Sequence, residues 1–478
     1  MAAPTAAGLV LAPNKAPAAV PILVAPPPAV AVLALDQGSG HAAVPVVRPG
    51  DRVRVGTPVA VADDPRATAL HAPVAGRVVA LETRPTPGGE GPCLVIENDG
   101  SDEPHAPIAP LDVSELAPAA LVDALRAAGV AGHGGAAFPT AAKLEEARGL
   151  AARHLLLNAA ECEPWICCDD ALLRARAGEV LGGARLLMRA FEAGRCTIAL
   201  LDDKPEARAA LEAALAASPD ERIAIVTLPA RYPAGAERTL IEAALGTEVP
   251  RGRRPPSAGV LCHNVATAAA VAAAACGRPV RSRIVTVTGG GVARPANVEA
   301  RLGTPIADLV RLCGGYVGEP VRLIAGGSMT GRALATDAVP VTLALNCALV
   351  ASRADLPERG PERPCIRCGD CATVCPPGLL PQQLLAGLAA GDPAFVERHG
   401  LADCIECGCC DYVCPSAIPL TERFRVARAA ARDAGAARGL ADHLRERYAG
   451  HLARLSATSE AERSAFEAAR AQARGRSP

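Results

Sequence analysis

Two cysteine-rich stretches determine how the C-terminal part of this chain must fold: CIRCGDCATVCPP at residues 365–377 and CIECGCCDYVCPS at residues 404–416. Both follow the pattern C-x2-C-x2-C-x3-C-P, which is typical of a domain with two [4Fe–4S] clusters, and the fourth cysteine of each run binds the other cluster. The spacing predicts two ligand sets: Cys365, Cys368, Cys371 and Cys414 for the first cluster, and Cys404, Cys407, Cys410 and Cys375 for the second. Zinc is disfavoured, because structural zinc sites usually take paired C-x2-C knuckles.

The composition of the 478-residue chain narrows the remaining possibilities. A formal net charge of −1 gives no field that favours nucleic acid, so no nucleic-acid partner is expected. Eighteen cysteines without a recognisable signal peptide predict a reducing compartment, where thiols bind metal rather than pair. No apolar stretch reaches the length of a membrane span, since residues 16–35 are broken by prolines and residues 264–276 are short and mostly alanine. Any membrane association is therefore expected to come through partners.

The N-terminal part divides into two segments. Residues 1–30 are rich in alanine and proline without a period, and they predict an extended arm or a lead-in to a strand. Residues 31–100 contain short valine-rich strands between turns, which predicts a small all-β unit. Within it, the segment Val53 to Val78 resembles the lipoyl or biotinyl carrier domain, a barrel-sandwich of two hairpins. Such carriers attach their cofactor to a lysine at a hairpin tip, and no lysine lies here.

Residues 111–280 alternate strands and helices. The predicted strands are 154–158, 197–201 and 223–228, and the predicted helices lie near 170–193 and 205–217. This order predicts a Rossmann-like parallel sheet covered by helices. Ligands of such sheets bind beyond the carboxyl ends of the strands, and the loop that begins at Asn158 lies at such an end.

A glycine-rich stretch, GHGGAAFPTAAK, occupies residues 132–143. Glycines let backbone N–H groups approach a phosphate, and a helix that begins near Pro139 would direct its positive end at the same anion. Lys143 would add a charge one turn into that helix. An ordinary turn before a helix is the alternative when this stretch is considered alone. Only three lysines, Lys15, Lys143 and Lys204, interrupt an arginine-rich background, which favours roles that arginine cannot fill.

Several motifs together resemble one family. The stretch 132–143 resembles the flavin loop shared by the flavin subunit of respiratory complex I and the C subunit of the Rnf ion-translocating electron transport complex. Further residues resemble the Rnf version: NAAECEP at 158–164 with Asp169 and Asp170, YPAGAE at 232–237, Asn264, and the openings of both cysteine runs. The match runs in order over residues 35–425, so the chain is identified as a member of the Rnf C-subunit family.

The resemblance implies noncovalent FMN with NADH stacked on its ring. The cofactor-binding residues that it implies are Gly132, Gly134, Gly135, Phe138, Lys143, Asn158, Glu161, Gly235, Glu237 and Asn264. Phe138 and Trp165 are the aromatic candidates on the nicotinamide side.

The implied fold is multidomain α/β plus β: the barrel-sandwich, a Rossmann-like flavin domain, an SLBB-type β-grasp domain at 281–350, a linker at 351–362, a two-cluster ferredoxin domain at 363–420 and a helical tail at 421–478. The tail is expected to be solvated, with docking to a membrane partner or anionic lipid as the alternative.

Electron counting connects these parts. NADH gives up two electrons as a hydride whereas each cluster accepts one, and a flavin converts between the two. The resemblance implies an NADH-reactive oxidoreductase subunit at the cytoplasmic face of the inner membrane, which exchanges electrons with ferredoxin through other subunits of an ion-translocating complex. The alternatives are a diaphorase-like subunit of a soluble hydrogenase or formate dehydrogenase, and a flavin-free adaptor that binds clusters.

Four residues depart from the family pattern: His133, Cys167, Cys168 and Ala137, which stands where glycine is common. His133 stands where leucine or methionine is usual, and we interpret it as an exposed loop histidine. Cys167 and Cys168 replace small or hydroxylated residues and are interpreted as small apolar fillers. Cys409 lies between two ligands of the second run, and we expect it to be no ligand itself.

Overall fold

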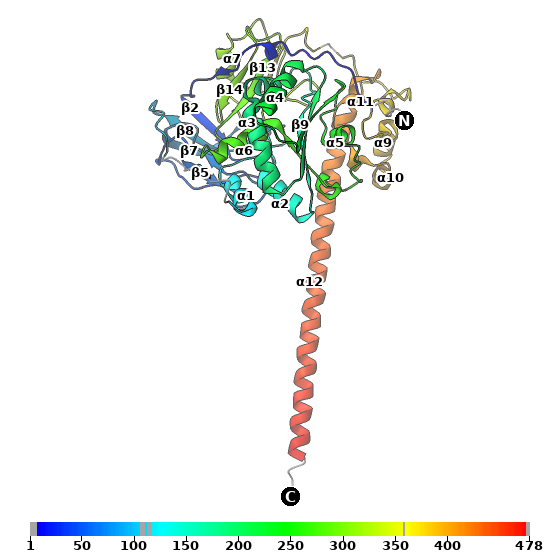
Figure 1. Cartoon of the computed structure of the whole chain (residues 1–478). Coiled ribbons are helices and arrows are strands. Elements are labelled where there is room, and N and C mark those ends of the chain that lie inside the picture. The colour runs from blue at the N-terminus through cyan, green and yellow to red at the C-terminus, as the bar shows by residue number, and fades with distance from the viewer. Residues whose placement is uncertain (1–6, 106–109, 112–115, 357–358, 475–478) are drawn as a thin grey trace. The chain divides into compact units, whose positions relative to one another are not determined.

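The computed structural model describes residues 7–105, 110–111, 116–356 and 359–474 (Figure 1). Its contacts divide the chain into two units, Met1–Gln382 with Asp403–Ile418, and Gln383–Ala402 with Pro419–Pro478. The first unit contains both cysteine runs and the residues that precede the first run. Parts of four predicted segments lie outside the described residues: 1–6 of the arm, 112–115 of the Rossmann-like domain, 357–358 of the linker and 475–478 of the tail.

The predicted all-β unit is confirmed as a barrel-sandwich. Its two sheets have the strand orders β2-β8-β7-β4 and β3-β5-β6. The strands are β2 (Val30–Ala34), β3 (Val44–Pro45), β4 (Arg52–Val53), β5 (Pro58–Val61), β6 (Leu70–His71), β7 (Gly76–Thr86) and β8 (Gly89–Asn98). Leu33, Leu94 and Ile96 fill its core. β7 and β8 are longer than the short strands that we predicted, because their polar ends continue past this core as an exposed hairpin that turns at Pro87 and Gly88.

The Rossmann-like domain has a four-stranded parallel sheet of order β11-β10-β9-β12. Its elements are α1 (Pro118–Ala127), α2 (Thr140–Gly149), β9 (His154–Ala159), α3 (Cys168–Ala190), β10 (Arg195–Leu201), α4 (Pro205–Ala217), β11 (Ile223–Leu228), α5 (Glu237–Leu245), η2 (Pro255–Ala258), β12 (Val260–Asn264) and α6 (Val265–Ala275). Successive side chains of a strand face opposite sides. Leu155 and Leu157 of β9 therefore join the core that includes α3 and α6, whereas Leu156 packs with Leu240 and Ile241 of α5.

Helices α3 and α6 approach each other closely at one glycine. A Cβ built on Gly183 would lie 1.8 Å from the carbonyl oxygen of Ala268, so a larger residue at this position would push the helices apart. The first turn of α3 and the N-cap of α6 both belong to the site described below. Their positions depend on this contact, since the two helices cover the same face of the sheet.

The β-grasp domain is built on a six-stranded sheet of order β1-β14-β13-β17-β15-β16. Its elements are β1 (Leu23–Val24), β13 (Ser282–Thr288), β14 (Ala296–Arg301), α7 (Ile306–Leu312), β15 (Arg322–Ala325), β16 (Arg332–Leu334) and β17 (Cys347–Ala351). Strand β1 comes from the N-terminal segment, which also contains η1 (Ala16–Ala19). The lead-in to a strand that we expected there thus ends in a sheet of a different domain, where β1 pairs in parallel with β14.

The cysteine runs form two similar loops, each followed by one turn of helix, α8 (Asp370–Thr373) and α11 (Cys409–Tyr412). Gly369 and Gly408 precede these turns with left-handed backbones, φ +90° and +77°, which glycine adopts without strain. The remaining elements are α9 (Pro381–Ala389), α10 (Pro393–Arg398), η3 (Leu401–Asp403) and α12 (Leu420–Arg474).

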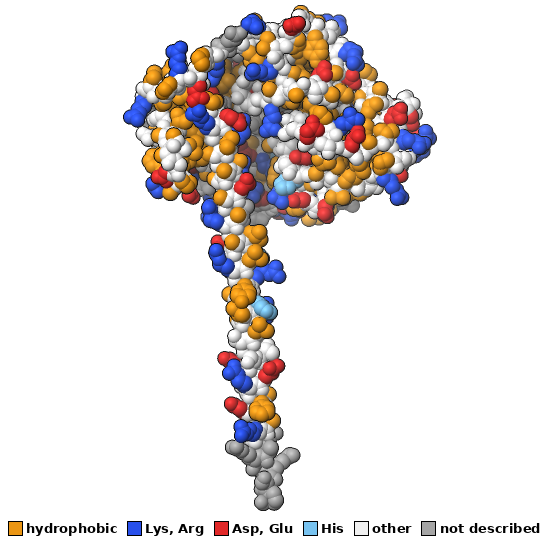
Figure 2. Space-filling view, turned by 180° about the vertical axis from the view of Figure 1, so that it is seen from behind, with side chains coloured by type: hydrophobic (Ala, Val, Ile, Leu, Met, Phe, Trp, Pro, Cys, Tyr) orange, Lys and Arg blue, Asp and Glu red, His pale blue; other side chains and the backbone are white. Residues whose placement is uncertain are grey.

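Helix α12 confirms that the tail is helical. Figure 2 shows apolar side chains along it, interspersed with charged ones. The large exposed apolar residues of this helix are Val426, Leu440, Leu444, Tyr448, Leu452, Leu455 and Phe466. Among the residues described, no helix combines the length and apolar character needed to cross a membrane.

Candidate functional site

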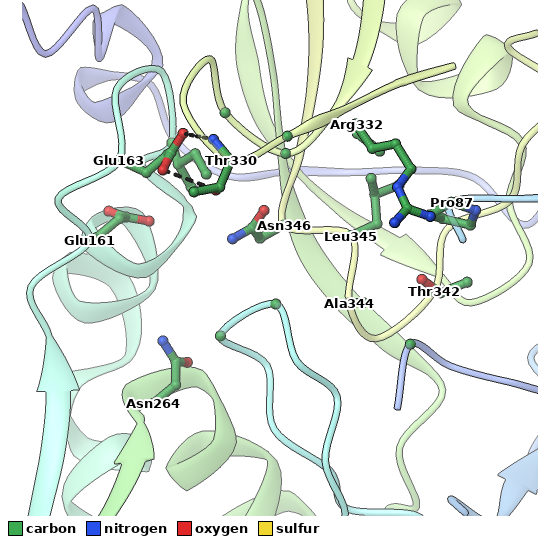
Figure 3. A pocket seen from close by; sticks show the side chains of 18 of the residues that line it. Pro87, Glu161, Glu163, Asn264, Thr330, Arg332, Thr342, Ala344, Leu345 and Asn346 are labelled. Carbon is green, nitrogen blue, oxygen red and sulfur yellow. Dashed lines mark hydrogen bonds between the residues drawn. The ribbon is translucent and has the colours of Figure 1, made fainter. Parts of the chain in front are cut away.

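A cavity of about 570 Å³ lies where β9 and β12 end (Figure 3). Cofactor pockets in proteins are typically a few hundred to about 1,000 Å³. All three upstream domains line it: the barrel-sandwich contributes the hairpin tip at Pro87 and Gly88, the Rossmann-like domain its strand-end loops, and the β-grasp domain the segment Ala325–Gly327. Arg332 of β16 fixes one of these junctions, because its Nη1 donates to the carbonyl oxygen of Gly88 at 2.8 Å.

Six of the ten predicted cofactor residues line this cavity. They are Gly134, Gly135, Asn158, Glu161, Gly235 and Asn264. Asn158 joins two of the loops, since its Oδ1 accepts from the backbone N of Ala160 at 3.0 Å and its Nδ2 donates to the carbonyl oxygen of Gly235 at 2.8 Å. Gly135 has φ +102°, and a Cβ added to it would meet no atom within 4 Å, so its backbone faces open space. An exposed glycine backbone of this kind suits the close approach of a phosphate.

The other four predicted residues are not among the lining residues. Lys143 Nζ donates to Glu237 Oε1 at 2.9 Å and to the carbonyl oxygen of Cys262 at 2.8 Å, so these two predicted residues pair with each other. The backbone N of Gly132 donates to the carbonyl oxygen of Phe138 at 2.9 Å and closes the glycine loop. Trp165, the aromatic candidate, packs with Ile166, Cys168, Ile324, Cys347 and Leu349.

Two carboxylates meet at the start of α3. Glu161 accepts from the backbone N of Asp169 at 2.7 Å and of Asp170 at 3.1 Å, and thereby caps the helix. Asn264 Nδ2 donates to Asp169 Oδ2 at 2.5 Å, and its own Oδ1 caps α6 by accepting from Ala266. Burial, together with the negative charge of Glu161, raises the pKa of Asp169 to about 7.

The carboxylate of Glu163 binds a loop of the β-grasp domain at the edge of the cavity. Its carboxylate accepts from the backbone N of Met329 at 2.7 Å and from both the N and Oγ1 of Thr330 at 3.1 Å, as Figure 3 shows for Thr330. A Cβ on Gly327 would lie 2.2 Å from Glu163 Cγ, so this loop tolerates only glycine there. Sequence reasoning assigned neither Glu163 nor Asp169 a role at the site. The sequence did offer an indication that Glu163 belongs to the site, because it follows Glu161 by two residues in the same loop.

All three lysines lie beside the site loops. Lys15 Nζ donates to the carbonyl oxygen of Glu161. Lys204 is only 2% exposed, and its Nζ pairs with Asp203 at 2.6 Å. Burial lowers the pKa of Lys204, and the positive charge of Lys15 lowers it further.

His133 is not the exposed loop residue that we expected. It is only 5% exposed, and its Nδ1 lies 2.9 Å from the carbonyl oxygen of Ala131. Burial lowers its pKa to about 3, and the charge of Arg283 contributes. The prediction was wrong because Arg283 of β13 and Thr267 of α6 hold the backbone of His133 between two elements that are distant in the sequence. Cys167 and Cys168 are both buried, as expected of small fillers.

The eight predicted cluster ligands gather in the paired loops. Burial raises the pKa of Cys375 to about 12, and the charges of Cys407 and Cys404 contribute. Burial also raises the pKa of Cys371, where the charges of Cys368 and Cys365 contribute. The exchange of fourth ligands between the two runs stays a prediction. Four thiols per site is the donor set that a [4Fe–4S] cluster takes.

The second run lies next to the cavity wall. Tyr232 OH donates to the carbonyl oxygen of Cys407 at 2.6 Å. Cys162, which lines the cavity, packs against the same small apolar cluster as Tyr232, Cys407 and the fully buried Cys409. The cavity and the second run thus share one layer of side chains.

Comparison with known proteins gives four domain matches in chain order. The matching families are described as "RnfC Barrel sandwich hybrid domain" at residues 5–101, "Nuo51 FMN-binding domain" at 125–273, "SLBB domain" at 284–333 and "4Fe-4S dicluster domain" at 364–418. The glycine backbone, the two asparagines and the size of the cavity fit an FMN, and the eight thiols fit two clusters.

Curated relatives share one name, that of the C subunit of an ion-translocating oxidoreductase complex. The relative from Pseudomonas aeruginosa is 44% identical over 95% of this chain and 59% of its own length, and that from Erwinia tasmaniensis is 43% identical over 84% and 50%. The relative from Rhodobacter capsulatus is 39% identical over 84% of this chain and 78% of its own length. The chain thus spans only 50–59% of the first two relatives.

Among solved structures, an NAD+-reducing [NiFe]-hydrogenase in the H2-reduced state aligns with 66% of this chain and 61% of its own. The identity is 24% and the TM-score is 0.45. That score is too low to support an argument about fold or function.

Proposed function

Since this chain belongs to the family of C subunits of ion-translocating oxidoreductase complexes, we propose that it takes electrons from NADH at an FMN and passes them singly to two [4Fe–4S] clusters. The observation that supports this most is the shared wall: Cys162 lines the cavity and packs with Cys407, a predicted ligand of the second cluster. Electron transfer between two cofactors needs a short distance between them, and this shared wall places the cavity next to the second run. The bound flavin supplies the conversion between a two-electron hydride and single electrons.

The residues of the cavity have distinct roles in this proposal. The backbones of Gly134 and Gly135 receive the phosphate end of FMN, while Asn158 and Asn264 hold the loops on both sides of it. Lys143 and Glu237 act through each other, because their ion pair joins α2 to the start of α5 next to Gly235. Glu163 holds the β-grasp loop at Met329 and Thr330, and Thr330 lines the cavity beside it.

The partners follow from the family. We infer that other subunits of a membrane-bound complex receive the electrons, that ferredoxin is the distant redox partner, and that the chain is peripheral at the cytoplasmic face. The diaphorase-like alternative is weaker, because the N-terminal match is to the barrel-sandwich domain that bears the Rnf family's name. The flavin-free adaptor is disfavoured by the FMN-domain match and by the open glycine loop.

An anaerobic reconstitution tests the proposal. We expect about eight irons, about eight sulfides and one FMN per chain, and bleaching of the flavin absorbance when NADH is added. A chain that acquires its clusters but retains no FMN would be the adaptor instead. Retention of FMN without reduction by NADH would contradict NADH as the donor.

A further inference from the structure

One buried carboxyl group, that of Asp169, borders two cavities. It lines the large cavity described above, and it also lines a second cavity of about 180 Å³ between α3, α6 and β13. The second cavity includes exposed residues at its outer end, among them Glu179 and Arg278. Asp169 is itself only 7% exposed. A side chain that separates a cofactor cavity from a second, solvent-facing one is in a position to exchange protons between them.

The hydrogen bonds of Asp169 leave one oxygen available. Asn264 Nδ2 donates to Oδ2 at 2.5 Å, and no hydrogen bond between described residues engages Oδ1. Two further features hold the carboxyl group in place: its backbone N is bound by Glu161, and Gly183 keeps α3 against α6. Oδ1 is therefore the atom of this carboxyl group that can hold a proton without losing a partner.

The charges around this group come from three elements. Glu161 on the loop after β9 favours the protonated acid, whereas Arg283 on β13 and Lys204 before α4 favour the carboxylate. The neighbouring thiol of Cys168, on α3, has its pKa raised well above the usual value by burial and by the charge of Asp169. His133, from the glycine loop, lines the second cavity and is kept neutral by burial. Burial is the largest cause and Glu161 the next, and together they raise the pKa of Asp169 to about 7.

We propose that Asp169 is the proton carrier of the flavin site and uses the second cavity as its path to solvent; this inference rests on the proposed function. NADH and one proton together deliver a hydride and a proton to the bound FMN, and NAD+ leaves. The proton comes from Asp169 as its Oδ1–H bond breaks, and solvent restores it. When two electrons have left singly for the clusters, two protons remain to be released, and Asp169 carries them outward in turn.

The first test uses the flavin-free chain, so that it does not depend on the proposed function. Infrared difference spectra between acid and alkaline pH should contain a carboxylic C=O band that titrates near neutral pH. This band should be absent from Asp169→Asn and present in Asp170→Asn. The latter is a matched control, because Asp170 is the next residue of α3, is equally buried, and pairs with Arg174 instead of lining either cavity. A band that survives in Asp169→Asn overturns the proposal.

The second test uses the FMN-loaded chain with its clusters. After reduction by NADH, reoxidation by the clusters should depend on pH near neutrality and be slower in D2O. Asp169→Asn should slow it at least tenfold and remove both dependences, with the control within twofold. Unchanged rate and isotope effect in the variant overturn the proposal, whereas a wild-type chain that NADH does not reduce overturns the proposed function instead.

A third variant tests the path without touching Asp169. Ala270→Leu places a larger side chain in the second cavity, on the α6 side. The infrared band should remain, while its exchange with D2O and the reoxidation rate should slow severalfold. Exchange at the wild-type rate shows that protons leave by another route and contradicts the proposal. This variant also tests whether protons move through the second cavity if Asp169→Asn does not fold.

Discussion

The two cysteine runs have nearly the same backbone and very different surroundings. In both, the residue before the second cysteine is left-handed, with φ +59° at Arg367 and +54° at Glu406, and a left-handed glycine follows that cysteine. Cys365 and Cys368 of the first run are nevertheless exposed, whereas Cys407 is held by Tyr232. The second run therefore packs against the cavity wall through Cys407 and Cys409, whereas the first two cysteines of the first run are exposed.

This difference has an energetic consequence. Cluster potentials depend on solvent exposure and on hydrogen bonds around the sulfurs. A Cβ on Gly408 would lie 3.0 Å from the carbonyl oxygen of Met329, so the second loop is packed against the β-grasp segment, while the corresponding position at Gly369 is open. We therefore expect the two clusters to differ in potential although their ligand sets are the same.

The largest effect is expected from replacing a fourth cysteine. Cys375→Ser should reduce the iron content from about eight to about four per chain by removing the second cluster, because the sequence pattern assigns Cys375 to the cluster of the second run. Cys414→Ser should instead remove the first cluster. Iron analysis with low-temperature electron paramagnetic resonance distinguishes the two. Loss of the first cluster in Cys375→Ser would show that each run keeps its own fourth ligand.

A smaller effect should follow from loosening the support of the second run. Glu163→Gln loses an ionic acceptor of three hydrogen bonds to Met329 and Thr330, which we expect to cost about 2 kcal/mol of unfolding free energy. The measurement is urea denaturation of the anaerobic chain. The exposed surface pair Arg84 and Glu82 provides a control, since Glu82→Gln should change stability by less than about 0.5 kcal/mol. Equal losses in both variants would contradict a supporting role for Glu163.

Removal of one hydroxyl group tests the hydrogen bond between Tyr232 and the second run. Tyr232→Phe deletes the hydrogen bond to Cys407, at a cost of about 1 kcal/mol, and should shift the potential of the second cluster but not of the first. Tyr412→Phe is the matched control, because Tyr412 belongs to the same run and is 55% exposed. Redox titration of both clusters is the measurement. A shift in the first cluster alone would reverse our assignment of the two runs.

The smallest effect is expected from replacing the isoleucine that follows the first cysteine of each run. Ile366 and Ile405 follow the first cysteine of each run, and Ile366 is 68% exposed whereas Ile405 is partly buried. Ile366→Ser should change the unfolding free energy by less than about 0.5 kcal/mol, and Ile405→Ser should cost about 1 kcal/mol. Parallel thermal unfolding gives the comparison. A larger loss for Ile366→Ser would mean that the first run is covered in the folded chain.

Local patterns predicted much of the architecture. Helix α4 and strand β11 begin and end as predicted, because Pro205 and the apolar run from Ile223 to Leu228 mark them in the sequence. The residues that line the cavity were predicted only in part, since some of them come from the hairpin tip at Gly88 and the loop at Gly327. The positions of these residues depend on contacts between domains, such as that of Arg332 with Gly88, which no local pattern encodes. His133 was misplaced for the same reason.

The N-terminal segment binds residues that are synthesised long after it. Leu9 pairs with Tyr232, Pro13 accepts from the backbone of Trp165, and β1 joins β14. Contacts of such large sequence separation form late in folding, because long loops must close first. The segment that carries Lys15 is therefore expected to settle on Glu161 only after the β-grasp domain has emerged from the ribosome. Cofactor loading in the cell is thus expected to be post-translational.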